Sequence, residues 1–191
     1  MTGTAKDFVQ LLRVYKHDYL NHLQVLLGYL QLKKPELALD YAREAIEEIQ
    51  ENGTIMRLGL PKLTIWLLLK RMQLEERGIT LTLQNETDFA ALECMDEELL
   101  EWFKAVEDVI SLKLNSLPVE AQGWEICFDG SGPYEIVFNL PILQDNPWPG
   151  CLEPCLARLA GGITATWSSN EQKFALKLLI PTNLCKKRLN F

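Results

Sequence analysis

The chain contains only two histidines, His17 and His22, and both fall in one short stretch near the N-terminus. A neutral imidazole is a good nucleophile, and the phosphohistidine that it forms can hand its phosphoryl group onward, so histidine suits reversible phosphoryl transfer. Asn21 follows His17 by one helical turn, where its amide could hydrogen-bond the ring or the phosphoryl oxygens. The pattern makes His17 a candidate phosphoryl carrier. From the residues alone, an exposed helix histidine without a chemical role remains an alternative.

Helix geometry separates the two histidines. Successive residues turn by about 100° around a helix, which places His17 almost opposite the apolar stripe of its helix and His22 at the edge of that stripe. The stripe consists of Phe8, Tyr15, Tyr19 and Leu26. We therefore expect His17 to be exposed and His22 to be a half-buried packing residue. The face of His17 also carries the polar and small residues Arg13, Asn21, Gln24 and Gly28, which predict an open docking surface for a partner.

Two amphipathic helices must position this surface. Apolar residues recur at helical spacing over residues 6–32, and Pro35 is typical of the start of a second helix over residues 35–51. Asn52-Gly53 is suited to a left-handed cap at its end. The result is an antiparallel hairpin. Because one hairpin cannot cover both apolar stripes, we expect a homodimer in which two hairpins form a four-helix bundle.

The rest of the chain alternates between helical and strand patterns. Helices are expected from Pro61 to Gly78, over 97–114 with Asp96 as the cap, and around 152–159. Strands are expected over 79–83, 124–128, 134–139, 163–167 and 174–180. Helices layered on one side of a mixed or antiparallel sheet give an α+β sandwich. We expect two domains, the hairpin at 1–54 and the sandwich at 55–191.

Composition excludes several classes. The net charge of −7 argues against a nucleic-acid partner. The longest apolar run, Leu63 to Leu69, is far shorter than the roughly 20 residues of a membrane span. The N-terminal residues lack the pattern of a secretory signal, so a cytoplasmic protein without a membrane partner is expected. The five cysteines are odd in number and scattered, which favours reduced thiols, and no ligand set for a metal is apparent.

The stretch from His17 to Leu32 resembles the phosphoacceptor motif of the sporulation initiation phosphotransferase B family, which the citrate- and malate-type sensor histidine kinases share. In that motif His-Asp-x-x-Asn is followed by Leu-Gln, then by Gly and Leu-Gln-Leu. The residues in these places are His17-Asp18, Asn21, Leu23-Gln24, Gly28 and Leu30-Gln31-Leu32. The resemblance implies that His17 is phosphorylated, that Asp18 and Asn21 assist, and that the hairpin dimerises.

The remainder is similar to a degenerate ATP-binding domain of histidine kinases. Leu159-Ala160-Gly161-Gly162, followed by a strand, resembles the C-terminal part of that domain. Asp108 stands where the family kinases carry an Asn that ligates Mg²⁺. The stretch 145–150 has prolines where backbone N–H groups should face phosphate, and proline has no N–H to donate. The resemblance thus implies a kinase-like domain that binds no cofactor of its own.

The resemblance implies an ATP-independent phosphotransferase that works in a phosphorelay. It would pass a phosphoryl group between the aspartyl-phosphate receiver domains of response regulators through a phosphohistidine, in the control of sporulation. The receiver domain would supply the Mg²⁺. Two alternatives stay open: a sensor histidine kinase with an unusual nucleotide site, and a non-catalytic module that binds a receiver without transfer.

Overall fold

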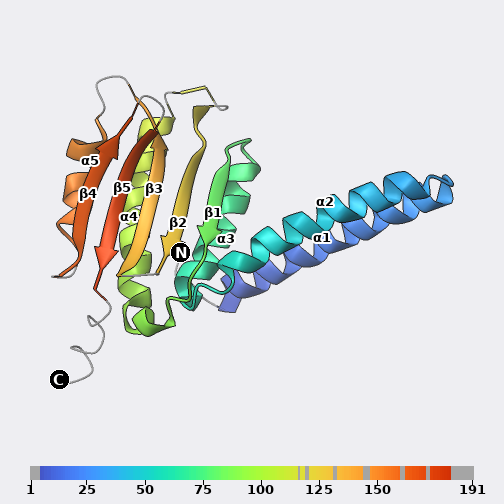
Figure 1. The fold of residues 1–191 in the computed structure, drawn as a ribbon, viewed down its shortest axis with the longest axis horizontal. Helices are drawn as coiled ribbons and strands as arrows, with labels where there is room; N and C mark the ends of the chain where they lie inside the picture. The colour runs from blue at the N-terminus through green and yellow to red at the C-terminus, as the bar shows by residue number, and fades with distance from the viewer. Residues whose placement is uncertain are drawn as a thin grey trace.

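The computed structural model describes residues 5–115, 117–118, 121–130, 133–143, 147–159, 162–170 and 173–181. These residues form a long helical hairpin and a sandwich of helices and a five-stranded sheet, and the hairpin extends outward from the sandwich (Figure 1). The predicted α+β class with an N-terminal helical hairpin is confirmed.

The hairpin consists of α1 (Ala5–Gln31) and α2 (Pro35–Ile55). Helix α2 continues through Gly53, so the end predicted at Asn52-Gly53 is wrong. The reason lies in tertiary packing: Ile55 and Leu58 are fully buried in the common core, and their burial holds the last turn in place.

A residue with left-handed backbone conformation ends α1. Lys33 has a φ of 55°. The N–H of Lys34 donates to the carbonyl of Tyr29 at 2.9 Å, and the N–H of Lys33 donates to the carbonyl of Leu30 at 3.0 Å. This pair of hydrogen bonds is a Schellman motif, in which glycine is the usual left-handed residue. It satisfies the last carbonyls of α1 and reverses the chain into α2.

The sheet has the strand order β1-β2-β3-β5-β4, with β1 parallel to β2 and every other pair antiparallel. The strands are β1 (Leu81–Asn85), β2 (Trp124–Asp129), β3 (Tyr134–Pro141), β4 (Thr164–Ser169) and β5 (Lys173–Ile180). The first strand begins two residues later than predicted because pairing with β2 starts where Leu81 faces Trp124. Across the sheet, Leu83, Ile126, Phe138 and Leu176 form one buried row.

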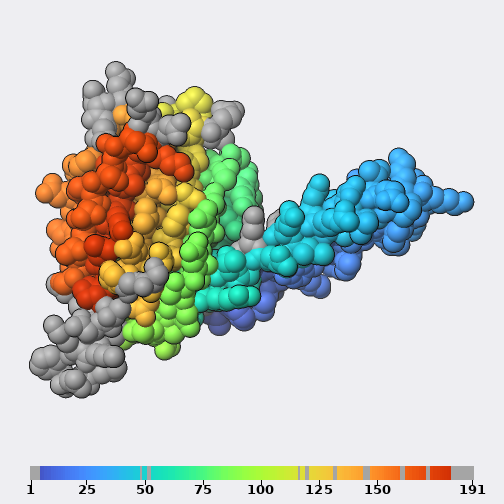
Figure 2. All heavy atoms as spheres, viewed as in Figure 1, coloured from blue at the N-terminus to red at the C-terminus, as the bar shows by residue number. Residues whose placement is uncertain are grey.

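Helices cover one face of the sheet, and no helix of the described residues covers the face turned to the viewer (Figures 1 and 2). The covering helices are α3 (Pro61–Glu75), α4 (Asp96–Leu114) and α5 (Trp148–Leu156), with a short 3-10 helix at Ala90–Met95 that the sequence did not predict. Helix α5 begins earlier than expected because Trp148 is fully buried and anchors the first turn. Asp96, predicted to cap α4, is instead its first residue, and its carboxylate binds the start of α3.

Both helices attach the base of the hairpin to the sandwich, α2 through Ile55 and α1 through two residues of its first turns. Leu11 is buried in the common core, and Tyr15 packs against the core from the next turn. Burial raises the pKa of the Tyr15 hydroxyl, while the nearby guanidinium of Arg71 on α3 acts in the opposite direction. The base is therefore fixed, whereas the rest of the hairpin extends away from the sandwich (Figure 2).

The cysteines differ from the expectation of reduced thiols at one position. Cys94 takes part in a disulfide bond. Cys127, Cys151 and Cys155 are free thiols, as predicted. The odd number of cysteines in the sequence could not reveal which of them pair, because pairing depends on distances in the fold.

Candidate functional site

Helix α1 presents three faces to different surroundings. One face, with Leu11, Tyr15 and His22, packs against α2 and the sandwich. A second face is apolar but exposed, and it carries Phe8, Leu12, Tyr19, Leu23 and Leu30. The third face is polar and carries His17. Phe8 and Tyr19 of the predicted stripe are exposed because α2 covers only one side of α1.

His17 is the centre of the polar face, and its side chain is 74% exposed, as the helix geometry predicted. The Nδ2 atom of Asn21 lies 3.1 Å from Nδ1 of His17. The Oδ1 atom of Asp18 lies 3.3 Å from the same nitrogen. Within the described residues, no hydrogen bond engages Nε2 of His17. The two predicted assisting residues thus meet on one ring nitrogen and leave the other open to solvent.

The three predicted docking residues share this region of α1 with His17. Arg13 and Gln24 are exposed, while Gly28 is half-buried. A Cβ atom added at Gly28 would meet no other atom within 4 Å, so the surface beside it is open. Their role in docking stays a prediction.

His22 lies between the two helices of the hairpin and is half-buried, as predicted. Its Nδ1 atom is 3.0 Å from the hydroxyl of Tyr41 on α2, and the two rings are in contact. The ring of Tyr41 also contacts Tyr29. The sequence reasoning missed Tyr41 because the pairing of side chains across the hairpin depends on the register set at Lys33, which periodicity does not define.

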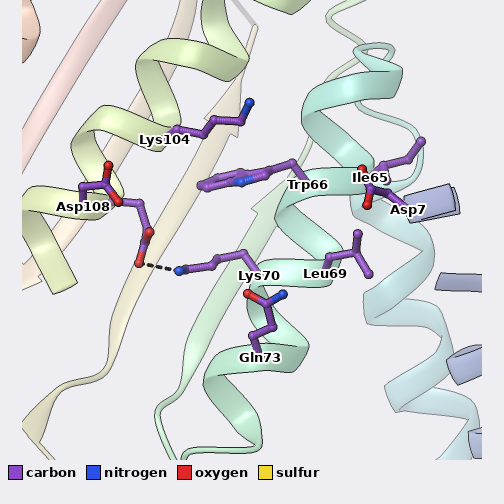
Figure 3. Close-up of a pocket in the computed structure, with 9 residues that line it drawn as sticks. Asp7, Ile65, Trp66, Leu69, Lys70, Gln73, Lys104 and Asp108 are labelled. Atoms are coloured by element: carbon purple, nitrogen blue, oxygen red, sulfur yellow. Dashed lines mark ion pairs between the residues drawn. The ribbon is translucent and has the colours of Figure 1, made fainter. Parts of the chain in front are cut away.

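A pocket of about 350 Å³ opens between α3 and α4 (Figure 3), and His17 is not among the residues that line it. It is lined by Asp7, Ile65, Trp66, Leu69, Lys70, Gln73, Lys104, Glu107 and Asp108. Nζ of Lys70 lies 2.7 Å from the buried carboxylate of Glu107, and Lys104 pairs with Glu101. Since both lysines already have carboxylate partners and two further acidic residues, Asp7 and Asp108, line the pocket, it is poorly suited to a polyphosphate.

Two buried tryptophans, Trp102 on α4 and Trp148 on α5, connect α5 with α4 and with the end of β3. The indole of Trp102 donates to the carbonyl of Cys155 at 2.9 Å, and the indole of Trp148 donates to the carbonyl of Pro141 at 2.9 Å. Both indoles are buried. Asp145, Asn146, Ala160 and Gly161, which entered the comparison with the kinase domain, lie outside the described residues.

Metal-binding clusters and membrane-spanning helices are both absent from the described part of the chain. No group of three or more His, Cys, Asp or Glu side chains there is arranged to hold a metal ion. None of the helices in that part combines the length and apolar character that a membrane-spanning segment requires.

Comparison with known proteins identifies a family match over the hairpin and one related sensor kinase. Residues 1–58 match the family described as Sensor_kinase_SpoOB-type, alpha-helical domain. A segment of 91 residues is 32% identical to a protein of Halalkalibacterium halodurans described as "Probable C4-dicarboxylate sensor kinase". The aligned segment makes up 47% of this chain and 17% of that protein, so the match covers less than a fifth of the relative. The family match contains both hairpin helices and the whole polar face of α1.

Proposed function

We propose that the chain is a histidine phosphotransferase of a two-component phosphorelay, on the premise that residues 1–58 match the α-helical domain of SpoOB-type sensor kinases. The chain is related to sensor histidine kinases. In the proposed function, His17 accepts a phosphoryl group from the aspartyl phosphate of one receiver domain and passes it to the aspartate of another. The likeness to sporulation phosphotransferases favours a role in sporulation control.

The observation that carries the proposal is the open Nε2 atom of His17 on an exposed, polar helix face. In the forward step, the Nε2 lone pair attacks the phosphorus, an N–P bond forms, and the P–O bond to the receiver's aspartate breaks to release its carboxylate. The ring becomes positively charged while Nδ1 keeps its proton. The carboxylate of Asp18, 3.3 Å from Nδ1, stabilises that charge.

The receiver completes the site in this proposal. It supplies the Mg²⁺ that neutralises the phosphoryl oxygens, so the chain needs no metal of its own. The chain contributes a nucleophile on a rigid helix and a surface that aligns the receiver, which lowers the entropic part of the barrier. Arg13, Gln24 and Gly28 are the proposed docking residues on that surface.

We also propose a homodimer. Large apolar side chains stand exposed along both hairpin helices, among them Leu12, Leu23 and Leu30 on α1 and Ile46 on α2. Monomeric proteins rarely expose contiguous apolar patches of this kind, and a second hairpin would cover them in a four-helix bundle.

ATP independence is a further part of the proposal. Its support is the aspartate at position 108, together with the burial of Trp102 between α4 and α5 and of Trp148 against the end of β3. The runner-up is a sensor kinase that autophosphorylates His17 from ATP, which the named relative favours. Titration calorimetry with Mg²⁺-ATP separates the two: saturable binding at submillimolar concentration supports the kinase.

The decisive experiment incubates the full chain with Mg²⁺ and a phosphorylated receiver domain from the same genome. We expect acid-labile phosphate on the chain, its loss in His17→Ala, and its retention in His22→Ala. Loss in His22→Ala together with retention in His17→Ala would overturn the site. A stable complex without any phosphohistidine would support the non-catalytic receiver-binding module instead.

A further inference from the structure

Asp18 and Asn21 require opposite protonation states of one nitrogen atom, Nδ1 of His17. Both lie within hydrogen-bonding distance of Nδ1 of His17, at 3.3 Å for Oδ1 of Asp18 and 3.1 Å for Nδ2 of Asn21. A carboxylate oxygen only accepts, so its contact requires a proton on Nδ1. An amide nitrogen only donates, so its contact requires a bare Nδ1. The neutral ring can satisfy one of the two residues at a time.

We infer that Asp18 and Asn21 select opposite tautomers of the neutral His17 ring, and that Asn21 restrains the nucleophile by holding a fraction of it in the unreactive form. When Nδ1 accepts from Asn21, the proton sits on Nε2, and the exposed nitrogen has no lone pair for attack. When Nδ1–H donates to Asp18, Nε2 carries the lone pair. Asp18 and Asn21 are thus positioning residues with opposite effects.

The consequence for reactivity rests on the proposed function, but the tautomer ratio does not. Asp18 is half exposed, and each contact is a single hydrogen bond open to solvent, so neither residue dominates. Removing either one should shift the ratio by roughly threefold to tenfold. A receiver that engages the amide of Asn21 would free Nδ1 to donate to Asp18, which couples docking to activation of the nucleophile.

The test is ¹⁵N NMR of the imidazole nitrogens in the full chain, at a pH where both histidine rings are neutral. Asn21→Ala should raise the fraction of His17 with the proton on Nδ1, and Asp18→Ala should lower it. His22 serves as the internal reference, because its Nδ1 is bound to Tyr41 and should not respond. Far-UV circular dichroism confirms that each variant keeps its helices.

The outcomes are distinct. An unchanged His17 ratio in Asn21→Ala overturns the inference, and so does a shift toward Nε2–H, which would mean that Asn21 presents its carbonyl to Nδ1–H. The expected shift in a chain that takes no phosphate from a receiver would remove the proposed function and leave the tautomer assignment intact. Phosphate uptake on His17 without the shift would overturn the tautomer assignment and leave the proposed function intact.

Discussion

The carboxylate of Asp96, the first residue of α4, accepts a hydrogen bond from the backbone N–H of Leu63 on α3 at 3.0 Å. Its other oxygen accepts from the N–H of Lys62 at 2.8 Å. Helix α3 needs this help because Pro61 has no N–H and its N-cap residue, Leu60, has no side-chain acceptor. One residue of α4 therefore caps a helix that begins more than 30 positions earlier in the chain, and it ties the two helices together.

We predict that Asp96→Ala lowers the free energy of unfolding by about 2 kcal/mol, since it leaves two N–H donors in the first turn of α3 without an acceptor, one of them buried. Asp96→Asn keeps one acceptor oxygen and should cost about half as much. Chemical denaturation measures both. Asp40→Ala is the matched control, because Asp40 forms only an exposed pair with Arg43; it should stay within about 0.5 kcal/mol of the unchanged chain. Equal effects at positions 96 and 40 would contradict the capping role.

The proposed dimer gives a second prediction. Leu23 is 61% exposed on the apolar face of α1, so a glutamate there should leave the folded hairpin intact but place a charge in the bundle interface. We expect Leu23→Glu to weaken the dimer by about 2 to 4 kcal/mol, or ~30- to 1000-fold in Kd. Sedimentation at micromolar concentration measures the change.

The control for the dimer is Leu112→Glu, which makes the same substitution at a residue on α4 that is 72% exposed. It should sediment like the unchanged chain. If the unchanged chain is a monomer at this concentration, or if both substitutions act alike, the bundle interface is wrong.

Much of this fold follows from local patterns in the sequence. The period of apolar residues located α1 and α4, and Pro35 and Pro61 marked the starts of α2 and α3. The same reasoning placed His17 in solvent and His22 at an interface, because exposure on a regular helix depends only on the angle between residues.

What the sequence missed depends on contacts between distant segments. Gly53 did not end α2 because Ile55 is held in the core, and Asp96 did not cap its own helix because the start of α3 lies within its reach. The competition between Asp18 and Asn21 for Nδ1 also became visible only with rotamers and distances. Periodicity predicts which residues share a face, and it does not predict which atoms meet.

Cys127 should respond to pH in a defined direction. Burial is the main cause that raises the pKa of its thiol, to about 11, and the nearby carboxylate of Glu125 acts in the same direction. Because the thiolate is the reactive form, we predict slow alkylation by iodoacetamide at pH 8 and faster labelling as the pH approaches 11, read by peptide mass spectrometry. Glu125→Gln lowers the pKa of the Cys127 thiol and should speed labelling at pH 9.

The raised pKa of Cys127 also predicts that the free energy of unfolding falls as the pH rises from about 9 toward 11. The thiol of the unfolded chain ionises at a lower pH than the thiol of the folded chain, which favours the unfolded state. Rapid labelling of Cys127 at pH 8 would contradict the assignment.

Gly28 gives the sharpest test of the docking surface, because it lies on the helix that carries His17, about 16 Å along the axis at the rise of an α-helix. A side chain at this position would meet no other atom of the chain within 4 Å, so Gly28→Leu should fit the fold and raise helix stability by up to about 1 kcal/mol. The same bulk should obstruct an approaching receiver. We expect phosphoryl transfer to His17 to slow by about tenfold or more, since displacing reacting groups by about 1 Å can cost 10²-fold in rate.

Gly53→Leu is the matched control. That glycine also lies in a hairpin helix with open space around it, so the substitution should add stability without slowing transfer. Rapid-quench measurement of phosphohistidine formation compares the three chains. Equal rates in all three would show that the receiver does not contact the surface at Gly28, whereas slow transfer in Gly53→Leu alone would place the docking surface at the base of α2.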